Sequence, residues 1–284
     1  MDATMERVSV NGVELEFDSA GSGEAVVFIH GAGVADTGLP LAAEPALRDH
    51  YRVIRYRRRG YAGSTPIQGP VSIAEHAQDC RALLGALDVT QAHVVGHSNG
   101  AFVALQLAVA APEVMSSLAL FEPPLLAVVN PQQIAEAMGP IIERYLAGDP
   151  IAAVDGFFSW VWGPDWRAEV SRTVPGGPEQ AEDDAATMFE SDAPSLQGWC
   201  FGAEEAAQIN QPVLFLSGTD TLAVLTEARD LLHAWLPQTE DDVMPGANHL
   251  LHMRHPLTPP RGSPNFSSAM PSRLFDDSQQ EGSS

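Results

Sequence analysis

The sequence predicts an α/β fold in which a mostly parallel central sheet is flanked by helices and carries an inserted helical region. Continuous apolar runs at residues 25–29, 118–121 and 213–216 are typical of strands buried on both faces of a parallel sheet. Segments with helical spacing of apolar residues separate these runs. Between residues 125 and 208 the strand pattern gives way to helical segments, expected at 132–146, 151–162 and 179–190 and separated by Pro and Gly, which indicates a helical insertion.

The N-terminal part predicts an edge of this sheet. Two alternating runs at residues 7–10 and 13–17 are joined by Asn11-Gly12, which is a strong hairpin signal. The alternation implies that one face of these strands lies in water. A capping box, S-I-A-E at residues 72–75, then predicts the start of a helix with one apolar stripe.

A very tight turn, G-H-S-N-G at residues 96–100, joins an apolar predicted strand directly to a helix; this turn is called the elbow, and the helix that follows it the elbow helix. Gly96 and Gly100 lack the Cβ atoms that would clash where the strand doubles back, and Ser98 is expected in a sparsely populated backbone conformation. Such a turn exposes the serine Oγ at the carboxyl end of the strand. The amide of Asn99 and the positive end of the helix would face a developing oxyanion.

Composition limits the partners and the compartment. A net charge of −22 argues against nucleic acids and anionic membranes, because both would repel the chain. No stretch has the length and apolarity of a membrane span, and the first residues lack the pattern of a signal peptide, so the expected location is cytoplasmic. Cys80 and Cys200 form no metal motif and are expected to be reduced, buried thiols. The sequence predicts no metal and no cofactor, and it leaves the oligomeric state open.

Two loops near the predicted strand ends have polar or glycine-rich character. H-G-A-G at residues 30–33 lacks the third glycine and the lysine of nucleotide-binding loops, so it is better interpreted as the second wall of an oxyanion hole, with the Ala32 amide as donor. Residues 57–59 are three consecutive arginines. In so acidic a chain we favour a clamp that hydrogen-bonds carbonyls and carboxylates over a polyanion site.

The ordered motifs H-G-A-G, R-R-R-G-Y-A-G-S, G-H-S-N-G, F-E-P-P, S-G-T-D and P-G-A-N-H resemble those of the α/β-hydrolase superfamily over roughly residues 7–255. The resemblance implies an α/β-hydrolase core of residues 1–123 and 209–255, with a helical cap of residues 124–208. Relatives continue with an amphipathic helix, whereas residues 256–284 have the composition of a disordered tail. A native linker and a frameshifted end both remain open for this tail.

The resemblance also implies roles for individual residues. Ser98 would be the nucleophile and His249, in the P-G-A-N-H motif, its general base, because a serine needs a base within hydrogen-bond reach. The amides of Ala32 and Asn99 would form the oxyanion hole. Of the other histidines, His30, His97 and His233 are interpreted as packing or loop-fixing residues, and His252 and His255 as solvated.

Two carboxylates remain open as the acid of the triad. Asp220 follows the strand on which most superfamily members carry this residue, but it lies two residues after Gly218, where the usual spacing is three. Glu122 lies at the end of the strand after the elbow helix, a position that some relatives use. A carboxylate buried there is costly unless it is paired, and protonated His249 would be a partner, so we favour Glu122. Its structural alternative is to cap the start of the inserted segment.

The implied reaction is acyl transfer from a small, largely apolar ester or lactone to water. A serine nucleophile disfavours dehalogenases and epoxide hydrolases, which use Asp in this superfamily. Four tryptophans that crowd the insertion predict an apolar slot, with packing between cap and core as the alternative: Trp160, Trp162, Trp166 and Trp199. A carbon–carbon bond hydrolase, a cofactor-free haloperoxidase and a catalytically impaired ligand-binding protein remain as rival interpretations.

Overall fold

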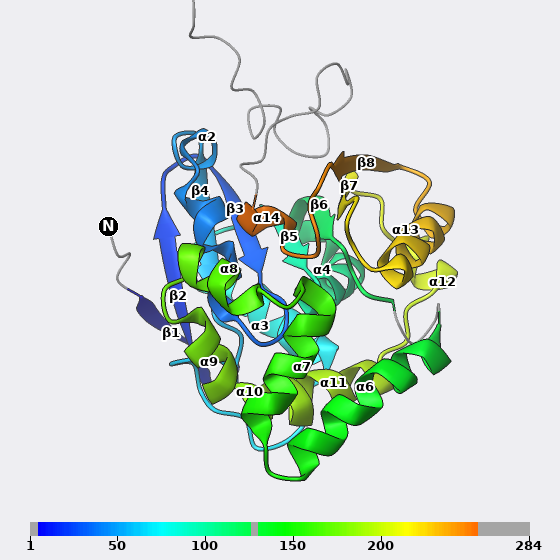
Figure 1. The fold of residues 1–284 in the computed structure, drawn as a ribbon. Coiled ribbons are helices and arrows are strands. Elements are labelled where there is room, and N and C mark those ends of the chain that lie inside the picture. The colour runs from blue at the N-terminus through cyan, green and yellow to red at the C-terminus, as the bar shows by residue number, and fades with distance from the viewer. Residues whose placement is uncertain (1–4, 126–129, 255–284) are drawn as a thin grey trace, which may run out of the picture.

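The computed structural model describes residues 5–125 and 130–254, which form one eight-stranded sheet with helices on both faces (Figure 1). The strand order is β1-β2-β4-β3-β5-β6-β7-β8. β2 pairs antiparallel with β1 and β4, and all other neighbours are parallel, which confirms the predicted fold class. The strands are β1 (Glu6–Val10), β2 (Val13–Ala20), β3 (Glu24–Ile29), β4 (Tyr51–Tyr56), β5 (Ala92–His97), β6 (Met115–Phe121), β7 (Val213–Gly218) and β8 (Thr239–Met244).

The predicted hairpin is confirmed at the start of the sheet. Asn11 and Gly12 connect β1 to β2 and have φ angles of 49° and 78°. A two-residue turn whose backbone twist matches that of the strands needs positive φ at both positions, which Asn and Gly tolerate best.

The two faces of the sheet bury different side chains. Along β3, Val27 and Ile29 pack into one apolar cluster, whereas Val26 and Phe28 pack into another, because successive side chains of a strand point to opposite faces. The first cluster includes α3 (Ile73–Ala86), α4 (Asn99–Ala110) and α13 (Ala223–Trp235). The second includes residues of the short helices α1 (Leu39–Ala43), α2 (Pro45–Arg48) and α14 (Leu251–Arg254). Short 3₁₀ turns precede α1 (η1, Ala35–Gly38) and β6 (η2, Pro112–Val114). The predicted capping box at the start of α3 is present.

The inserted helical segment lies between β6 and β7, and most of it gathers at one end of the sheet (Figure 1). The predicted helices at 132–146 and 151–162 are confirmed as α6 and α7, whereas the single helix predicted from 179 to 190 is wrong. That segment breaks into α9, α10 and the π-helical turn η3. The inserted helices are α6 (Pro131–Leu146), α7 (Pro150–Trp162), α8 (Trp166–Thr173), α9 (Gly177–Asp183), α10 (Ala185–Thr187), η3 (Met188–Asp192), α11 (Ala193–Ser195), η4 (Leu196–Gly198) and α12 (Ala203–Ala206).

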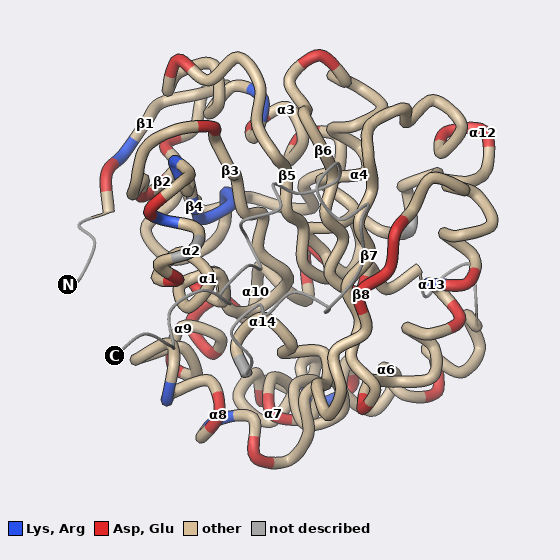
Figure 2. Tube along the Cα trace, turned by 90° about the horizontal axis from the view of Figure 1, so that it is seen from above, with Lys and Arg blue, Asp and Glu red and all other residues tan. Residues whose placement is uncertain are grey.

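The exact bounds of core and cap stay a prediction, and the predicted tail at 256–284 lies outside the described residues. Cys80 is buried as predicted, whereas Cys200, just before α12, is exposed, so the prediction of a buried thiol is wrong there. Among the described helices, none combines the length and the apolarity that crossing a bilayer requires. Seen from above, acidic residues are spread over the whole fold and form a continuous run along β8 (Figure 2).

Candidate active site

The strand register brings the predicted site residues to one edge of the sheet. His97 at the end of β5 pairs with Phe121 at the end of β6, and Phe121 pairs with Leu216 of β7. Ser98 and Glu122 are the next residues after two of these strand ends. Because the strands are parallel, both residues leave the sheet on the same side.

Ser98 occupies the strained position that the G-H-S-N-G turn predicts. Its φ and ψ angles are 52° and −121°, and its amide donates to the carbonyl of Phe121 at 2.9 Å. A Cβ on Gly96 would lie 2.6 Å from the Cα of Ala101, and one on Gly100 would collide with the carbonyl oxygen of Ile29 in β3. The two glycines therefore permit the sharp reversal that presents the serine at the strand end.

A buried carboxylate and an imidazole meet beside this turn. His249, in the loop after β8, lies with Nδ1 2.6 Å from Oε2 of Glu122. The exposed fraction is 0% for Glu122 and 3% for His249. The backbone of Glu122 has a φ of 46°, an uncommon conformation for a residue other than glycine. The fold thus holds this carboxylate in a conformation that costs energy, directly at the imidazole.

The remaining contacts of Glu122 define its role as an acceptor. The amide of Gly218 donates to Oε1 at 2.8 Å, and the hydroxyl of Thr221 donates to Oε2 at 2.9 Å. An ionised carboxylate is an acceptor only, so Nδ1 of His249 carries the proton of the hydrogen bond between them. The Nε2 atom of a neutral His249 is then left as the basic nitrogen.

Asp220, the alternative acid, does not take part in this arrangement. Its side chain is exposed and accepts from the hydroxyl of Thr219 at 3.0 Å, and its amide donates to the carbonyl of Ala247. The position three residues after Gly218, where the usual spacing would put the acid, is Thr221. Its hydroxyl contacts Glu122, so the customary acid position supports the carboxylate supplied by β6.

The H-G-A-G turn after β3 packs against the elbow. A Cβ on Gly31 would lie 3.1 Å from both the Cβ of Ser98 and Nδ1 of His97, so glycine at this position favours the close approach of the two turns. Within residues 5–125 and 130–254, the amides of Ala32 and Asn99 donate no hydrogen bond to another protein group. The geometry therefore leaves two backbone donors available beside the serine.

Two buried histidines fix the loops of the site, as predicted. His97 donates through Nε2 to the carbonyl of His249 at 3.0 Å and thereby fixes the loop that carries His249. His30 accepts at Nε2 from the Arg58 amide, so its Nδ1–H donates to the carbonyl of Gly31 at 2.7 Å. Burial and the neighbouring Arg58 hold the pKa of His30 well below its ordinary value.

The prediction that His252 is solvated is wrong, and His255 lies outside the described residues. His252 is 2% exposed, because α14 turns back over the sheet and places its ring 4.3 Å from that of His97. Burial, with a smaller contribution from His249, lowers its pKa to about 3. His252 is therefore neutral and packs as an aromatic ring.

The arginine run acts as the predicted clamp for carboxylates. Arg57 lies 2.7 Å from Asp36, and Arg59 lies 2.6 Å from Asp79. The middle arginine pairs with a carboxylate of the inserted segment. Figure 2 shows one group of basic residues near β2 and β4, with acidic residues close by.

The inserted tryptophans divide between two places. Trp162 and Trp166 are buried, and Trp162 stacks on Phe158 with ring centroids 4.0 Å apart. This aromatic group shares one apolar cluster with Val34 after β3 and Leu250 after His249, which favours packing between cap and core. Trp160 is partly exposed.

The prediction that Trp199 joins this group is wrong. Its ring packs on Phe102 of α4 at 4.9 Å, and its Nε1 donates to Gln106 at 2.9 Å. Trp199 lies in the segment that leads toward β7, and its indole packs against the apolar cluster that includes the residues of α4.

Two residues that hold the site together were not predicted from the sequence. Thr221 contacts Glu122 as described above. Asn248 donates from Nδ2 to the carbonyl of Trp162 at 2.7 Å and so ties the end of α7 to the residue before His249. A hydroxyl at the customary acid position and an amide next to the histidine were the available signals. Among the described residues, no three His, Cys, Asp or Glu side chains are grouped as a metal site would require.

The chain belongs to the α/β hydrolase family, whose sequence model matches residues 26–258. Two curated relatives match over about two fifths of their own length. A protein of Mycobacterium tuberculosis named as a candidate non-heme bromoperoxidase, BpoC, is 38% identical over 38% of this chain and 41% of its own. The 2-hydroxy-6-oxononadienedioate/2-hydroxy-6-oxononatrienedioate hydrolase of Paraburkholderia xenovorans is 34% identical over 38% and 39%.

Solved structures agree with this family over most of the chain. An α/β hydrolase from Sphaerobacter thermophilus superposes with a TM-score of 0.67 and 27% identity, covering 84% of this chain and 91% of that one. Est816, described as an N-acyl homoserine lactone degrading enzyme, gives a TM-score of 0.67 at 23% identity over 87% and 95%. At such low identity the second likeness concerns the fold alone.

Proposed function

We propose that this α/β hydrolase is a serine hydrolase that transfers the acyl group of a small, largely apolar ester or lactone to water. The observation that carries the proposal is the 2.6 Å hydrogen bond between His249 and the fully buried Glu122. It lies at the sheet edge where the elbow presents Ser98. A hydroxyl is a weak nucleophile at its free pKa, and an oriented imidazole is the usual means of activating it.

The reaction would proceed in two steps. Ser98 Oγ attacks the carbonyl carbon while Nε2 of His249 accepts its proton, and the amides of Ala32 and Asn99 stabilise the oxyanion. The leaving alcohol takes the proton from His249 as the acyl-enzyme forms. A water molecule then attacks the acyl carbon while His249 accepts its proton. Protonated His249 returns this proton to Ser98 Oγ as the bond between Oγ and the acyl carbon breaks, which releases the acid and regenerates the serine.

Glu122 would act by orienting His249 and stabilising its protonated form. The Gly218 amide and the Thr221 hydroxyl hold the carboxylate in place, so little reorganisation is needed when the imidazole becomes charged. In this proposal Asp220 has no catalytic role.

The apolar substrate class rests on the inserted segment. Phe158 and Met188 reach the H-G-A-G turn, where a Cβ on Gly33 would collide with the ring of Phe158 and lie 3.3 Å from the sulfur of Met188. An apolar wall beside an oxyanion donor favours acyl groups with little charge. The net charge of −22 further disfavours anionic substrates.

A carbon–carbon bond hydrolase is the second candidate function. The curated relative from Paraburkholderia xenovorans is named as a hydrolase of a different class of substrate. A serine and histidine pair could serve either the hydrolysis of an ester or the cleavage of a carbon–carbon bond. The partner would in both cases be a small molecule.

Burst kinetics with p-nitrophenyl esters of increasing acyl length would test the proposal. We expect a rapid release of p-nitrophenolate equal to the enzyme concentration and a slower steady state, because deacylation follows acylation. Ser98→Ala should remove the burst while leaving the fold intact. Binding of the esters without release of p-nitrophenolate would contradict hydrolysis and support the ligand-binding interpretation.

A further inference from the structure

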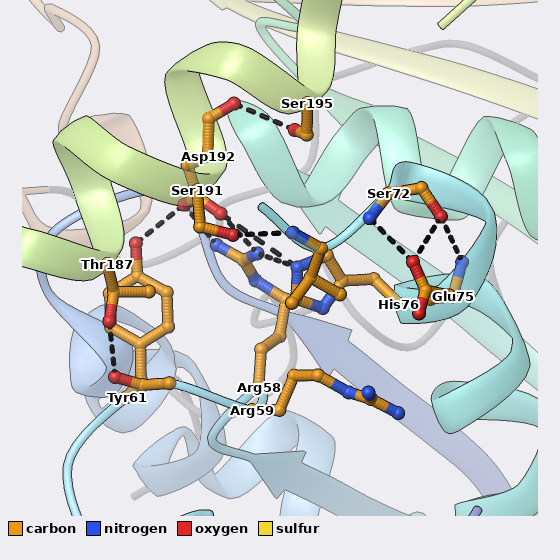
Figure 3. Close-up of polar contacts among 12 residues, drawn as sticks. Arg58, Arg59, Tyr61, Ser72, Glu75, His76, Thr187, Ser191, Asp192 and Ser195 are labelled. Carbon is orange, nitrogen blue, oxygen red and sulfur yellow. Dashed lines mark hydrogen bonds and ion pairs between the residues drawn. The ribbon is translucent and has the colours of Figure 1, made fainter. Parts of the chain in front are cut away.

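A buried hydrogen-bond network links the inserted segment to the arginine loop of the core (Figure 3). Asp192, the last residue of the π-helical turn η3, points toward Arg58 and accepts from its Nη1 and Nη2 atoms at 3.0 and 2.8 Å. The same carboxylate accepts from the hydroxyl of Tyr61 at 2.5 Å. One carboxylate of the cap therefore orients two side chains of the core.

Both of these side chains continue to the H-G-A-G turn. Arg58 donates from Nη2 to the carbonyl of Gly31 at 3.1 Å, and the hydroxyl of Tyr61 accepts from the amide of Gly33 at 3.2 Å. Gly31 and Gly33 flank Ala32, the residue whose amide is proposed as an oxyanion-hole donor. The peptide units on both sides of this donor are thus connected to Asp192.

The side chains of this network are buried, so water cannot replace the hydrogen bonds between them. The exposed fraction of the side chain is 0% for Arg58 and 2% for Asp192. Burial raises the pKa of Tyr61 well above its ordinary value, so the phenol keeps its proton and remains the donor to Asp192. In a site of this kind each hydrogen bond fixes the next, because an unpaired buried group is costly.

We propose that Asp192 is a positioning residue for the oxyanion hole: through Arg58 and Tyr61 the cap sets the position of the Ala32 amide. The catalytic part of this inference rests on the proposed hydrolase function, whereas the coupling between cap and turn does not. Asp192 forms hydrogen bonds with Arg58 and Tyr61, and these two side chains, not Asp192 itself, bind the H-G-A-G turn. Asp192 therefore acts on the turn through them. A π-helical turn at this place agrees with the frequent occurrence of such turns at functional sites.

Other hydrogen bonds of the same cap segment provide the contrast. Thr187 donates to the carbonyl of Gly60 at 2.6 Å, and the Val71 amide donates to Ser191 at 2.9 Å. These bonds attach the cap to the loop at residues 60–71 without reaching the H-G-A-G turn. If the network only anchored the cap, losing one of them would have the same consequences as losing the Tyr61 hydroxyl.

Tyr61→Phe and Thr187→Val form a matched pair for the test. Each removes one hydroxyl at the boundary between cap and core and leaves the Arg58–Asp192 ion pair intact. With a p-nitrophenyl ester, Tyr61→Phe should lower kcat about tenfold to 100-fold with KM changed less than about threefold, since misplacing a donor affects mainly the transition state. Thr187→Val should change kcat and KM by less than about threefold.

Hydrogen exchange of the backbone amides gives a readout that is independent of turnover. Tyr61→Phe should accelerate exchange in a peptide covering residues 31–34, while Thr187→Val should leave that peptide unchanged. Equal kinetics of the two variants, a change confined to KM, or unchanged exchange at residues 31–34 in Tyr61→Phe would each overturn the inference. A wild-type protein without ester turnover would refute the proposed function, and the exchange comparison would still decide the coupling.

Discussion

Two buried pairs lie on either side of the central strand that carries Ser98. Glu122 with His249 follows β6 and β8, whereas Arg58 with Asp192 joins the loop after β4 to the cap. In both pairs the carboxylate is almost completely buried. The partners of the two carboxylates differ, because an imidazole can accept and release a proton during a reaction whereas a guanidinium keeps its charge.

This difference assigns the two pairs to different tasks. A neutral imidazole can remain buried beside a hydrogen-bonded carboxylate and become charged only during turnover. The Arg58 guanidinium is charged at all times and needs Asp192 for as long as the protein is folded. Breaking the first pair should therefore reduce turnover and leave the fold stable, whereas breaking the second should reduce stability in addition to displacing the H-G-A-G turn.

The largest expected effect is on the turnover of Glu122→Gln. This change keeps the volume and hydrogen-bonding capacity of the side chain but removes the charge that stabilises protonated His249. We expect kcat to fall by about 10³ to 10⁴ with little change in KM, measured by steady-state kinetics with a p-nitrophenyl ester.

Asp220→Asn is the control at the other candidate acid. Its exposed side chain should contribute no more than about a few-fold through loop geometry. A large loss in Asp220→Asn with a mild one in Glu122→Gln would move the acid to β7. Comparable modest losses would indicate that the two carboxylates share the role, which also contradicts a single acid.

A smaller effect, on stability, is expected from Asp192→Ala. Removing one partner leaves the Arg58 charge buried and unpaired, so the free energy of unfolding should fall by about 3–5 kcal/mol. Replacing both partners, as in Arg58→Met with Asp192→Leu, should regain most of this loss because no buried charge remains. Denaturant unfolding followed by circular dichroism measures both variants.

Glu113→Ala provides the reference for an exposed pair. Its partner Arg81 and Glu113 itself are 57% and 58% exposed, so their separation should cost about 1 kcal/mol or less. A similar cost for Asp192→Ala would show that the Arg58 pair behaves like a surface pair, and the distinction between the two buried pairs would fail.

Much of the fold could be predicted from the sequence because its signals are local. The Asn11-Gly12 turn, the capping box at Ser72 and the glycines around Ser98 each act within a few residues, and all three were found at their predicted places. The pairing of Glu122 with His249 was favoured on physical grounds, since a buried carboxylate needs a partner.

The rest depends on contacts that no local pattern records. Arg58 and Asp192 are 134 residues apart, and the break of the predicted helix into η3 determines where Asp192 points. His252 is buried because α14 folds back on the sheet, a tertiary effect. Trp199 resembles the cap tryptophans in sequence but meets Phe102 of the core.

Labelling with a fluorophosphonate probe followed by mass spectrometry tests the central claim most directly, because the probe reports a competent serine and histidine pair without requiring the substrate. We predict a single adduct on Ser98 in the wild-type protein, slower labelling in Glu122→Gln and none in Ser98→Ala. An adduct that persists in Ser98→Ala, or a folded wild-type protein that is not labelled, would contradict the proposed catalytic serine.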